Sequence, residues 1–299
     1  MREMMKNKNW DVEFIGPPKE PKSFAGEGVD DVPKKMKMRI HFYFDSVSPY
    51  ANLAWHVLRR YEKIWDFELV LKPIFLGGVM KQTGNRPPGL LPQKAPYLVG
   101  EMQRARAFFN LPHLESFPPD NFFDKEFQKS YITVQRVLVA VIGDQMWEKE
   151  KKYEAIQNAF DLVHSTGKVL DGRVGENQNS IPPVTDDLIL DTILGGGHDG
   201  NNNTLHPDVN KKKAALLEQA KSSAAVKQKL ADNTKEAIEE HGAFGAPWLV
   251  VERSETSRAP AKVMKFFGSD RFEEIAFFFE KPWYGPDPLL KSKHVQSRL

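Results

Sequence analysis

Residues 37–73 contain the pattern that most constrains the fold: an apolar strand, a helix and a second apolar strand in close succession. Apolar residues alternate with more polar ones from 40 to 44, which is typical of a β-strand. Ser48 is a favourable N-cap, and Pro49 suits the first position of the helix that follows. A second alternating strand covers residues 67–71. Strand, helix and strand at this spacing predict a βαβ unit with two parallel strands.

The rest of the chain predicts a long helical stretch followed by a smaller group of strands. From 97 to 164 the periodicity is helical throughout, and a later helix ends at Gly242, a residue typical of helix C-termini. Residues 248–251 and 262–267 read as two strands separated by a charged turn, which indicates a hairpin. With a final helix through Phe279, the element order is β-α-β, a long helical insert, and β-β-α.

Two segments show no clear hydrophobic periodicity. Residues 76–96 contain four prolines and are predicted to form a long irregular loop, of a kind that is often functional. Residues 165–210 are polar and rich in Gly and Asn, and are predicted to form a surface insertion around one short apolar segment, Leu188 to Leu194. Helix is expected to resume near Lys213.

The chain has 299 residues and no cysteine. This excludes disulfides, thiolate zinc sites, cysteine nucleophiles and dithiol redox chemistry within the chain, so any sulfur chemistry must use a sulfur on a ligand. The 42 basic and 40 acidic residues give a net charge of +2, which provides no electrostatic reason to expect a nucleic acid or an anionic membrane as a partner. No stretch approaches the roughly 18 apolar residues of a membrane span.

Common catalytic and metal-binding motifs are missing from the sequence. The eight histidines show no paired metal spacing, and no glycine-rich phosphate loop follows a predicted strand. Chemistry would be expected at three places: Ser48-Pro49 at a strand–helix junction, Phe244–Pro247 before a strand, and Ser269-Asp270 as the cap of the last helix. A helix N-terminus favours an anion, and a proline that opens a strand indicates a simple strand start or a cis peptide bond. When each place is taken alone, ordinary capping chemistry explains it better than a functional site does.

Together these motifs resemble the kappa-class glutathione transferases, which belong to a wider family with the DsbA-like oxidoreductases and the 2-hydroxychromene-2-carboxylate isomerases. The stretches that carry the resemblance, in the family's order, are Phe42–Tyr50, Gly84–Lys94, Gly242–Pro247 and Phe267–Arg271. The resemblance implies an α/β fold in which a thioredoxin-like domain is interrupted by a large all-α insertion, as in DsbA. The implied parts are an N-terminal extension (1–36), a thioredoxin-like glutathione-binding domain (37–83 and 242–299) and a helical insertion domain (84–241, with the polar insertion 165–210).

The family's glutathione contacts map onto individual positions of this chain. By resemblance, the Ser48 hydroxyl would donate a hydrogen bond to the glutathione sulfur, and Pro49 and Tyr50 would shape that corner. Asn85 and Lys94 would hold the glycyl end of glutathione.

The remaining contacts come from the C-terminal part of the chain. Ala246, before a cis-Pro247, would pair its backbone with the cysteinyl part of glutathione, as an added strand does. Ser269 and Asp270 would bind the γ-glutamyl end, where the helix N-terminus would take the carboxylate and Asp270 the ammonium. In the oxidoreductase relatives a Cys-x-x-Cys opens the first helix. Since Ser48–Ala51 stands there in this chain, activation of a bound thiol replaces redox exchange.

The resemblance predicts a glutathione transferase with a role in detoxification, which activates the glutathione thiol as a thiolate and conjugates it to small hydrophobic electrophiles. No metal cofactor is expected. Two alternatives stay open. One is a glutathione-dependent isomerase of the 2-hydroxychromene-2-carboxylate type, in which Lys94, Arg104 or Arg106 would meet the substrate carboxylate. The other is a non-catalytic thioredoxin-like binding or chaperone module.

The chain ends and the oligomeric state complete the expectations. Ser297-Arg298-Leu299 is a conservative variant of a C-terminal peroxisomal address, so a peroxisomal location is predicted, with cytosolic and mitochondrial locations as alternatives. Residues 1–36 are expected to lie on the domain or to be partly disordered. The resemblance implies a homodimer, and the apolar pattern of residues 131–142 fits either a partner surface or an internal core.

Overall fold

The computed structural model describes residues 38–114, 124–165, 184–195, 207–253 and 261–290. Contacts group residues 35–299 into one unit, and the description below concerns the described residues of that unit. The predicted N-terminal extension, most of the polar insertion and the C-terminal Ser-Arg-Leu lie outside the described residues. Among the helices described, none combines the length and the apolar character that a membrane span requires.

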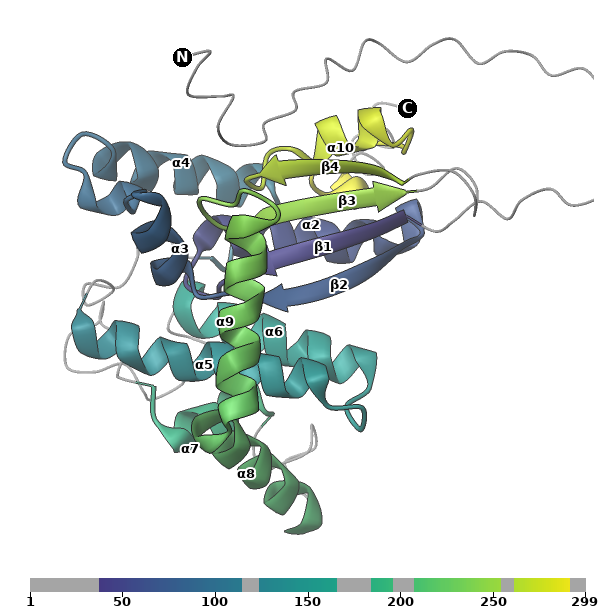
Figure 1. Cartoon of the computed structure of the whole chain (residues 1–299). Helices are drawn as coiled ribbons and strands as arrows, with labels where there is room; N and C mark the ends of the chain where they lie inside the picture. The colour runs from purple at the N-terminus through teal and green to yellow at the C-terminus, as the bar shows by residue number, and fades with distance from the viewer. Residues whose placement is uncertain (1–37, 115–123, 166–183, 196–206, 254–260, 291–299) are drawn as a thin grey trace, which may run out of the picture. The chain divides into compact units, whose positions relative to one another are not determined.

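A four-stranded mixed sheet lies at the centre of this unit, in the order β2-β1-β3-β4 (Figure 1). Its strands are β1 (Met38–Phe44), β2 (Phe67–Pro73), β3 (Trp248–Arg253) and β4 (Lys262–Phe267). β1 and β2 are parallel and joined by a helix, which confirms the predicted βαβ unit. β3 is antiparallel to both β1 and β4, which confirms the predicted hairpin.

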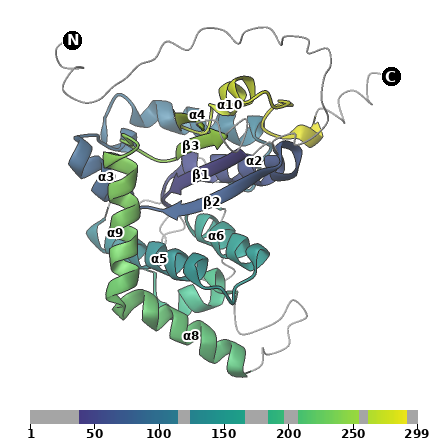
Figure 2. The same ribbon diagram turned by 45° about the vertical axis from the view of Figure 1, so that its right-hand side comes forward.

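Helices cover the sheet and extend beyond it. The described helices are α2 (Pro49–Trp65), α3 (Leu76–Thr83), α4 (Ala95–Phe108), α5 (Lys125–Gly143), α6 (Lys149–His164), α7 (Asp186–Leu188), α8 (Pro207–Ser222), α9 (Ala224–Glu239) and α10 (Phe272–Phe278), with a 3₁₀ turn over Pro88–Leu90 and a π-helical segment over Ile189–Ile193. In Figures 1 and 2, α2 lies behind the sheet, α9 crosses its front, and α8 extends from the far end of α9.

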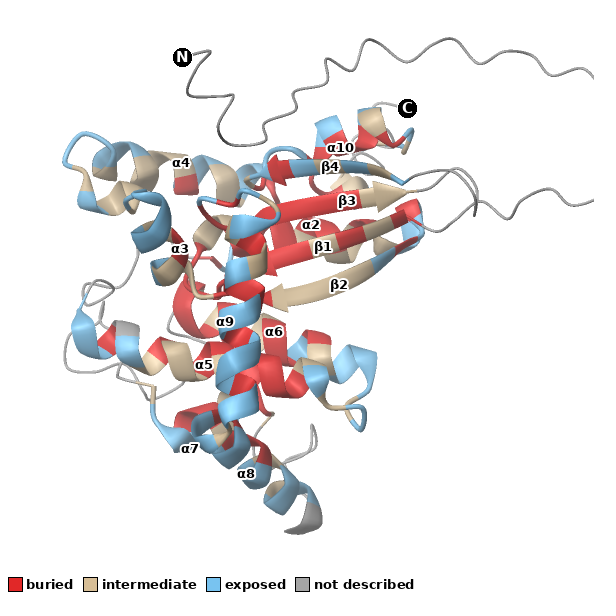
Figure 3. Ribbon diagram, in the orientation of Figure 1, coloured by how far each residue is buried: buried red, intermediate tan, exposed pale blue. Residues whose placement is uncertain are grey.

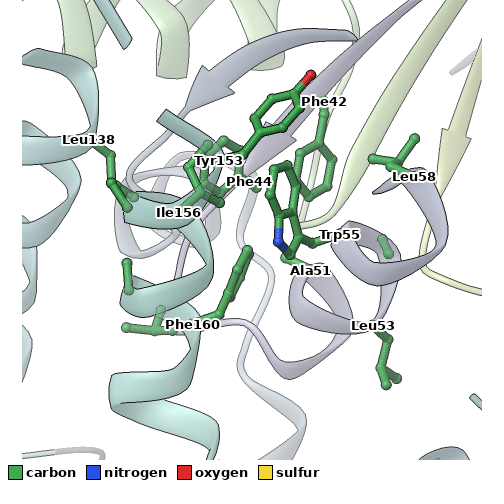
Figure 4. Close-up of a cluster of buried hydrophobic side chains, with 14 of the residues drawn as sticks. Phe42, Phe44, Ala51, Leu53, Trp55, Leu58, Leu138, Tyr153, Ile156 and Phe160 are labelled. Atoms are coloured by element: carbon green, nitrogen blue, oxygen red, sulfur yellow. The ribbon is translucent and has the colours of Figure 1, made fainter. Parts of the chain in front are cut away.

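The main hydrophobic core lies between the sheet and α2, and continues into α6. Phe42 and Phe44 of β1 are fully buried and stacked, with ring centroids 4.8 Å apart. Trp55 of α2 stacks near Phe42, and Phe160 of α6 contacts Phe44 (Figure 4). Burying side chains of this size is a principal source of stability, so this core fixes the position of the N-terminus of α2 relative to β1.

The opposite face of the sheet is also covered. Tyr43 is fully buried in a second cluster with Val79 of α3, Ala237 of α9 and Trp248 of β3. Its hydroxyl donates a 2.6 Å hydrogen bond to Glu236 of α9. Figure 3 accordingly shows the two central strands largely buried.

The helical stretch predicted for residues 97–164 is confirmed as α4, α5 and α6, with a break between α4 and α5. Residues of the 131–142 stretch that are buried within the chain itself are Tyr131, Val134, Val137, Leu138 and Val141. This stripe is therefore part of the internal core, rather than a surface offered to a partner.

The irregular loop predicted for residues 76–96 is wrong in part, because α3 occupies its first eight residues. No side chain within the segment caps α3. The Leu76 N–H instead donates to the Asp45 carboxylate at 2.8 Å, across 31 residues of sequence. A cap supplied from so far away leaves no local signal. Gly77 also disfavours a helix in a prediction from sequence. It suits the structure, however, because a Cβ there would lie 2.9 Å from the Phe75 ring.

The structure also tests three other predictions in the helical region. Helix begins at Pro207 rather than near Lys213, and it breaks at Ser223, whose hydroxyl caps α9. The apolar segment within the polar insertion is not on the surface, since its residues Leu188 and Ile193 are buried. The predicted stop at Gly242 is confirmed, because this residue has a φ of 72° and its N–H donates to Ile238.

Candidate active site

Ser48 lies at the N-terminus of α2, directly after the turn that leaves β1. Its hydroxyl oxygen accepts a hydrogen bond from the Ala51 N–H at 3.2 Å, as an N-cap does. The same hydroxyl donates its hydrogen to the carbonyl oxygen of Ala246 at 2.9 Å. Ser48 is almost completely buried, and Pro49 takes the first helical position as predicted.

The segment opposite Ser48 enters β3 through Ala246 and Pro247. Their peptide bond is cis, which confirms that prediction. The Ala246 carbonyl faces Ser48, whereas its N–H donates to no acceptor within the described part of the chain. An unpaired N–H beside a helix N-terminus is a suitable donor for the backbone of an extended peptide ligand.

Asn85 connects the loop after α3 to this same segment. Its Nδ2 donates to the Phe244 carbonyl at 2.8 Å, and its Oδ1 accepts from the Arg86 N–H. Between Phe244 and Ala246, Gly245 lies under the Phe267 ring, where a Cβ would approach to 2.8 Å. The structure thus brings the predicted residue Asn85 to the neighbourhood of Ala246.

Tyr50 points from the first turn of α2 toward α4. Its hydroxyl donates a short hydrogen bond to the carboxylate of Glu101. Burial raises the pKa of Tyr50 well above its usual value, and the Glu101 carboxylate and the nearby charge of Asp270 raise it further. Tyr50 therefore stays protonated, and Asp270 lies close enough to act on it electrostatically.

Ser269 and Asp270 lie at the turn between β4 and α10. Ser269 is buried, whereas Asp270 is exposed, with its carboxylate 3.6 Å from the Arg271 guanidinium. The prediction that these two residues cap the last helix is wrong. Arg271 is the N-cap, without a side-chain hydrogen bond, because the Asp270 carboxylate folds back over Gly268 instead. Gly268 tolerates this, since it has a φ of 102° and no Cβ.

Lys94 has no described contact with the other predicted site residues. It stands at the start of α4, exposed, and its ammonium makes no hydrogen bond or ion pair within the described ranges. Its predicted contact with the glycyl end of glutathione stays a prediction.

A buried polar network supports the corner that carries Ser48. Asp45 is fully buried, and its carboxylate accepts hydrogen bonds from the N–H groups of Val47 and Leu76 and from the Gln135 amide. Burial raises the pKa of Asp45, and these three donors counteract that effect only in part. The network links the β1–α2 turn to α3 and α5, so the three elements hold this corner in place.

A buried histidine completes this support from α6. The Nε2 of His164 lies 2.8 Å from the Ser46 carbonyl, which requires Nε2 to carry the hydrogen. Burial lowers the pKa of His164 to about 4, although the hydrogen bond to Ser46 opposes the shift. His164 is therefore neutral at physiological pH.

Sequence reasoning missed Glu101, Asp45, Gln135 and His164. Each acts through a contact between elements far apart in the chain, and no local motif marks such a contact. Within the described residues, no cluster of acidic and histidine side chains is arranged to hold a metal ion. The chemistry available at this corner is hydrogen-bond donation from a buried hydroxyl at a helix N-terminus.

Comparisons with known proteins identify the family of this chain. Residues 39–173 match the family model of a DSBA-like thioredoxin domain. Glutathione S-transferase kappa 1 of Rattus norvegicus is 30% identical over 249 residues, which cover 83% of this chain and 94% of the rat protein. The Homo sapiens protein of the same name is 28% identical over 249 residues, with the same two coverages.

Solved structures show the same fold. A 2-hydroxychromene-2-carboxylate isomerase superimposes with a TM-score of 0.54 at 19% identity, covering 81% of this chain and 94% of the isomerase. That likeness speaks for the DsbA-like thioredoxin fold alone. The sequence match to the rat transferase over nearly its whole length goes further: this chain belongs to the kappa-class glutathione transferase family.

Proposed function

We propose that this protein binds glutathione at the corner formed by Ser48, Asn85 and Ala246, and transfers it to small electrophiles. The observation that carries the proposal is the Ser48 hydroxyl, which lies at the N-terminus of α2 and donates to the carbonyl of Ala246. Glutathione S-transferase kappa 1 is the name of relatives that match most of the chain.

In the free protein the Ser48 hydrogen points to the Ala246 carbonyl. When the glutathione sulfur arrives, this hydrogen turns toward it and donates a hydrogen bond to the thiolate. Ser48 then acts as a hydrogen-bond donor, not as a nucleophile. The Ala246 backbone pairs with the cysteinyl part of glutathione, and Asn85 lies near its glycyl end.

The energies involved are sufficient for activation of the thiol. A thiol with a pKa near 8.5 is only a few per cent ionised at neutral pH, and lowering that pKa by two units takes about 2.7 kcal/mol. A hydrogen bond to a charged group supplies ~1.5–3 kcal/mol, and a helix N-terminus adds ~0.3–1 kcal/mol. The two effects together reach the required value without a cationic side chain at the sulfur.

The γ-glutamyl end of glutathione would lie toward the β4–α10 turn. Asp270 offers an exposed carboxylate for its ammonium group, and Ser269 lies beside it. Lys94, exposed at the start of α4, would supply the cationic partner of the glycyl carboxylate.

The experiment that tests this function is an ultraviolet-difference pH titration of bound glutathione. In the wild type the thiolate should appear below about pH 7.5, and Ser48→Ala should shift its appearance back toward the value for free glutathione. Ser223→Ala is the matched control, because Ser223 caps α9 in the same way but lies away from this corner. Glutathione that binds with an unshifted thiol, or that does not bind, would contradict the proposal.

We propose in addition that the protein is peroxisomal and acts as a homodimer. The peroxisomal location is supported by the C-terminal Ser297-Arg298-Leu299. Dimer formation is supported by apolar side chains on the edge strand β4, where Val263 and Phe267 are 48% and 40% exposed. Sedimentation of the wild type and of Val263→Lys tests the dimer, which should dissociate in the variant.

A further inference from the structure

A small hollow opens beside the N-terminus of α2, one helical turn from Ser48. The residues that line it are Pro49, Asn52, Leu53, Met102, Arg106, Leu114 and His164. They come from α2, from α4, from the segment after α4 and from the end of α6. The Asn52 N–H donates to the Ser48 carbonyl at 3.1 Å, so the hollow and the proposed sulfur site share the same turn of helix.

Asn52 is the unusual member of this lining. Its side chain is fully buried, and neither Oδ1 nor Nδ2 has a hydrogen-bond partner in the described part of the chain. Buried amides are ordinarily hydrogen-bonded, because an unpaired one is costly. A side chain that could be apolar at no loss of packing here presents both a donor and an acceptor.

Two further polar groups face the same hollow. His164 lines the hollow with a neutral ring, whose Nε2 donates to the Ser46 carbonyl. Arg106 contributes a guanidinium, which also donates to the Pro112 carbonyl. The remaining residues of the lining are apolar.

Arg106 differs from the other two cationic candidates, Arg104 and Lys94, in its position. Arg104 lies over the Tyr97 ring, 5.5 Å from its centroid, and Lys94 is exposed at the start of α4. Of the three residues that the sequence suggested for binding a substrate carboxylate, Arg106 is the one that lines the hollow.

The size of the hollow limits what it can hold. Its free space is about 10 Å³, which is the room that a single water molecule requires. A whole substrate does not fit, but a single oxygen atom of a carboxamide or carboxylate does. In the free protein a water molecule suits this place, and a substrate oxygen that reproduces its hydrogen bonds can displace it without loss.

We propose that this hollow receives one oxygen substituent of the electrophile, and that Asn52 is the residue that selects for it. The inference rests on the proposed transferase function and names its substrate class: compact, largely apolar electrophiles that carry a carboxamide or, preferably, a carboxylate. The Nδ2 of Asn52 donates to the oxygen of either group, its Oδ1 accepts from the N–H of a carboxamide, and Arg106 adds the preference for a negative charge. The body of the substrate stays outside the hollow.

A benzylic chloride illustrates the reaction. The glutathione thiolate, whose proton has left to solvent, attacks the benzylic carbon. A carbon–sulfur bond forms, the carbon–chlorine bond breaks, and chloride leaves with the bonding electrons. The oxygen substituent on the ring takes no part in these steps, so its effect on the rate reports recognition alone.

The experiment compares benzyl chloride with its para-carboxamide and para-carboxylate derivatives. For each compound, kcat/KM is divided by the rate constant of the uncatalysed reaction with glutathione in the same buffer, which removes differences in intrinsic reactivity. The wild type should favour the carboxamide over benzyl chloride by about 3- to 10-fold, and the carboxylate by a further tenfold or so.

Two variants locate the source of this preference. Asn52→Leu should reduce the advantage of both oxygenated compounds over benzyl chloride toward one, and Arg106→Gln should remove only the additional advantage of the carboxylate. Arg104→Gln is the matched control on the same helix, and it should keep the wild-type ratios.

Glutathione binding is measured for every variant by calorimetry, which separates the two proposals. If the wild type binds glutathione and turns over all three compounds at the same normalised rate, the transferase function stands and the hollow is a water site only. If Asn52→Leu folds, binds glutathione and keeps the wild-type ratios, Asn52 does not select the substrate. If the wild type fails to bind glutathione, both proposals fall.

Discussion

The hydroxyl of Ser48 donates a 2.9 Å hydrogen bond to the carbonyl of Ala246, a residue 198 positions later in the chain. One partner caps α2 directly after β1, and the other precedes β3, which is the neighbour of β1 in the sheet. The pairing of β1 with β3 is therefore what brings the two residues together.

Ser48→Ala should lower the free energy of unfolding by about 2 kcal/mol, since it removes an N-cap and leaves the Ala246 carbonyl without its donor. Ser223→Ala, which removes only the cap of α9, should cost about 1 kcal/mol. Urea unfolding of both variants gives the comparison. Equal losses would mean that the bond to Ala246 contributes nothing to stability.

Gly245→Ala should destabilise the site-bearing turn, because the new Cβ would stand 2.8 Å from the Phe267 ring. That ring packs on Phe244 at a centroid distance of 4.6 Å, so moving it loses an aromatic contact, and we expect a cost of about 1–2 kcal/mol. The cost should shrink in a Phe267→Leu background. Gly143→Ala, where nothing lies within 4 Å of the added Cβ, should not destabilise the protein.

His164 should make the protein less stable in mild acid. Its folded-state pKa of about 4 lies below its ordinary value of 6.5, so the unfolded chain binds the additional proton between these values. The contribution of His164 is complete above pH 6.5 and is lost as the pH falls toward 4, with a slope of up to about 1.4 kcal/mol per pH unit.

The test of this pH dependence is the variant His164→Gln, whose amide can still donate to Ser46. Urea unfolding of both proteins at several values of pH gives the two slopes. Asp45 and His56 titrate in both proteins, so the difference between the slopes belongs to His164. Parallel slopes would show that the buried ring does not remain neutral.

Asn85→Ala should weaken glutathione binding by roughly 3- to 10-fold, because the loop after α3 loses its hydrogen bond to Phe244. Isothermal titration calorimetry measures the dissociation constant directly. The position of the thiolate transition in the pH titration should stay near the wild-type value, because Ser48 is untouched. A variant that binds as well as the wild type would place the glycyl end elsewhere.

Removal of Ser297–Leu299 should shift a fluorescent fusion of the full chain from peroxisomes to the cytosol. The tag is placed at the N-terminus so that the C-terminal tripeptide stays free. Replacing Arg298 by Lys should keep the peroxisomal pattern, whereas replacing Leu299 by Asp should abolish it. A wild-type fusion outside peroxisomes would contradict the proposed location.

Local patterns in the sequence predicted the elements that depend on local chemistry. The alternation in β1, the Ser48–Pro49 start of α2, the β3–β4 hairpin and the stop at Gly242 are each encoded within a few residues. The resemblance to a known family then supplied the thioredoxin-like fold with its all-α insertion, which no single segment carries.

The elements that sequence reasoning misjudged depend on distant partners. α3 begins where the Asp45 carboxylate accepts from the Leu76 N–H. A helix that lacks a local capping side chain is easily predicted as a loop. The β4–α10 turn was misread because Ser269 and Asp270 look like caps, although the backbone turn at Gly268 directs the Asp270 carboxylate away from the helix. Nothing in the local sequence marks Asn52, because its importance depends on hydrogen-bond partners that its buried amide lacks within the described residues.

The long separation between Ser48 and Ala246 also has a consequence for synthesis of the chain. A polypeptide emerging from a ribosome can form α2 and its serine cap early, but the acceptor for the serine hydrogen is not made until four-fifths of the protein has been translated. The helices between Ser48 and Ala246 must leave β1 and β3 free to pair, although these strands lie far apart in the sequence. Any fragment that stops before Ala246 therefore carries the helix without the site.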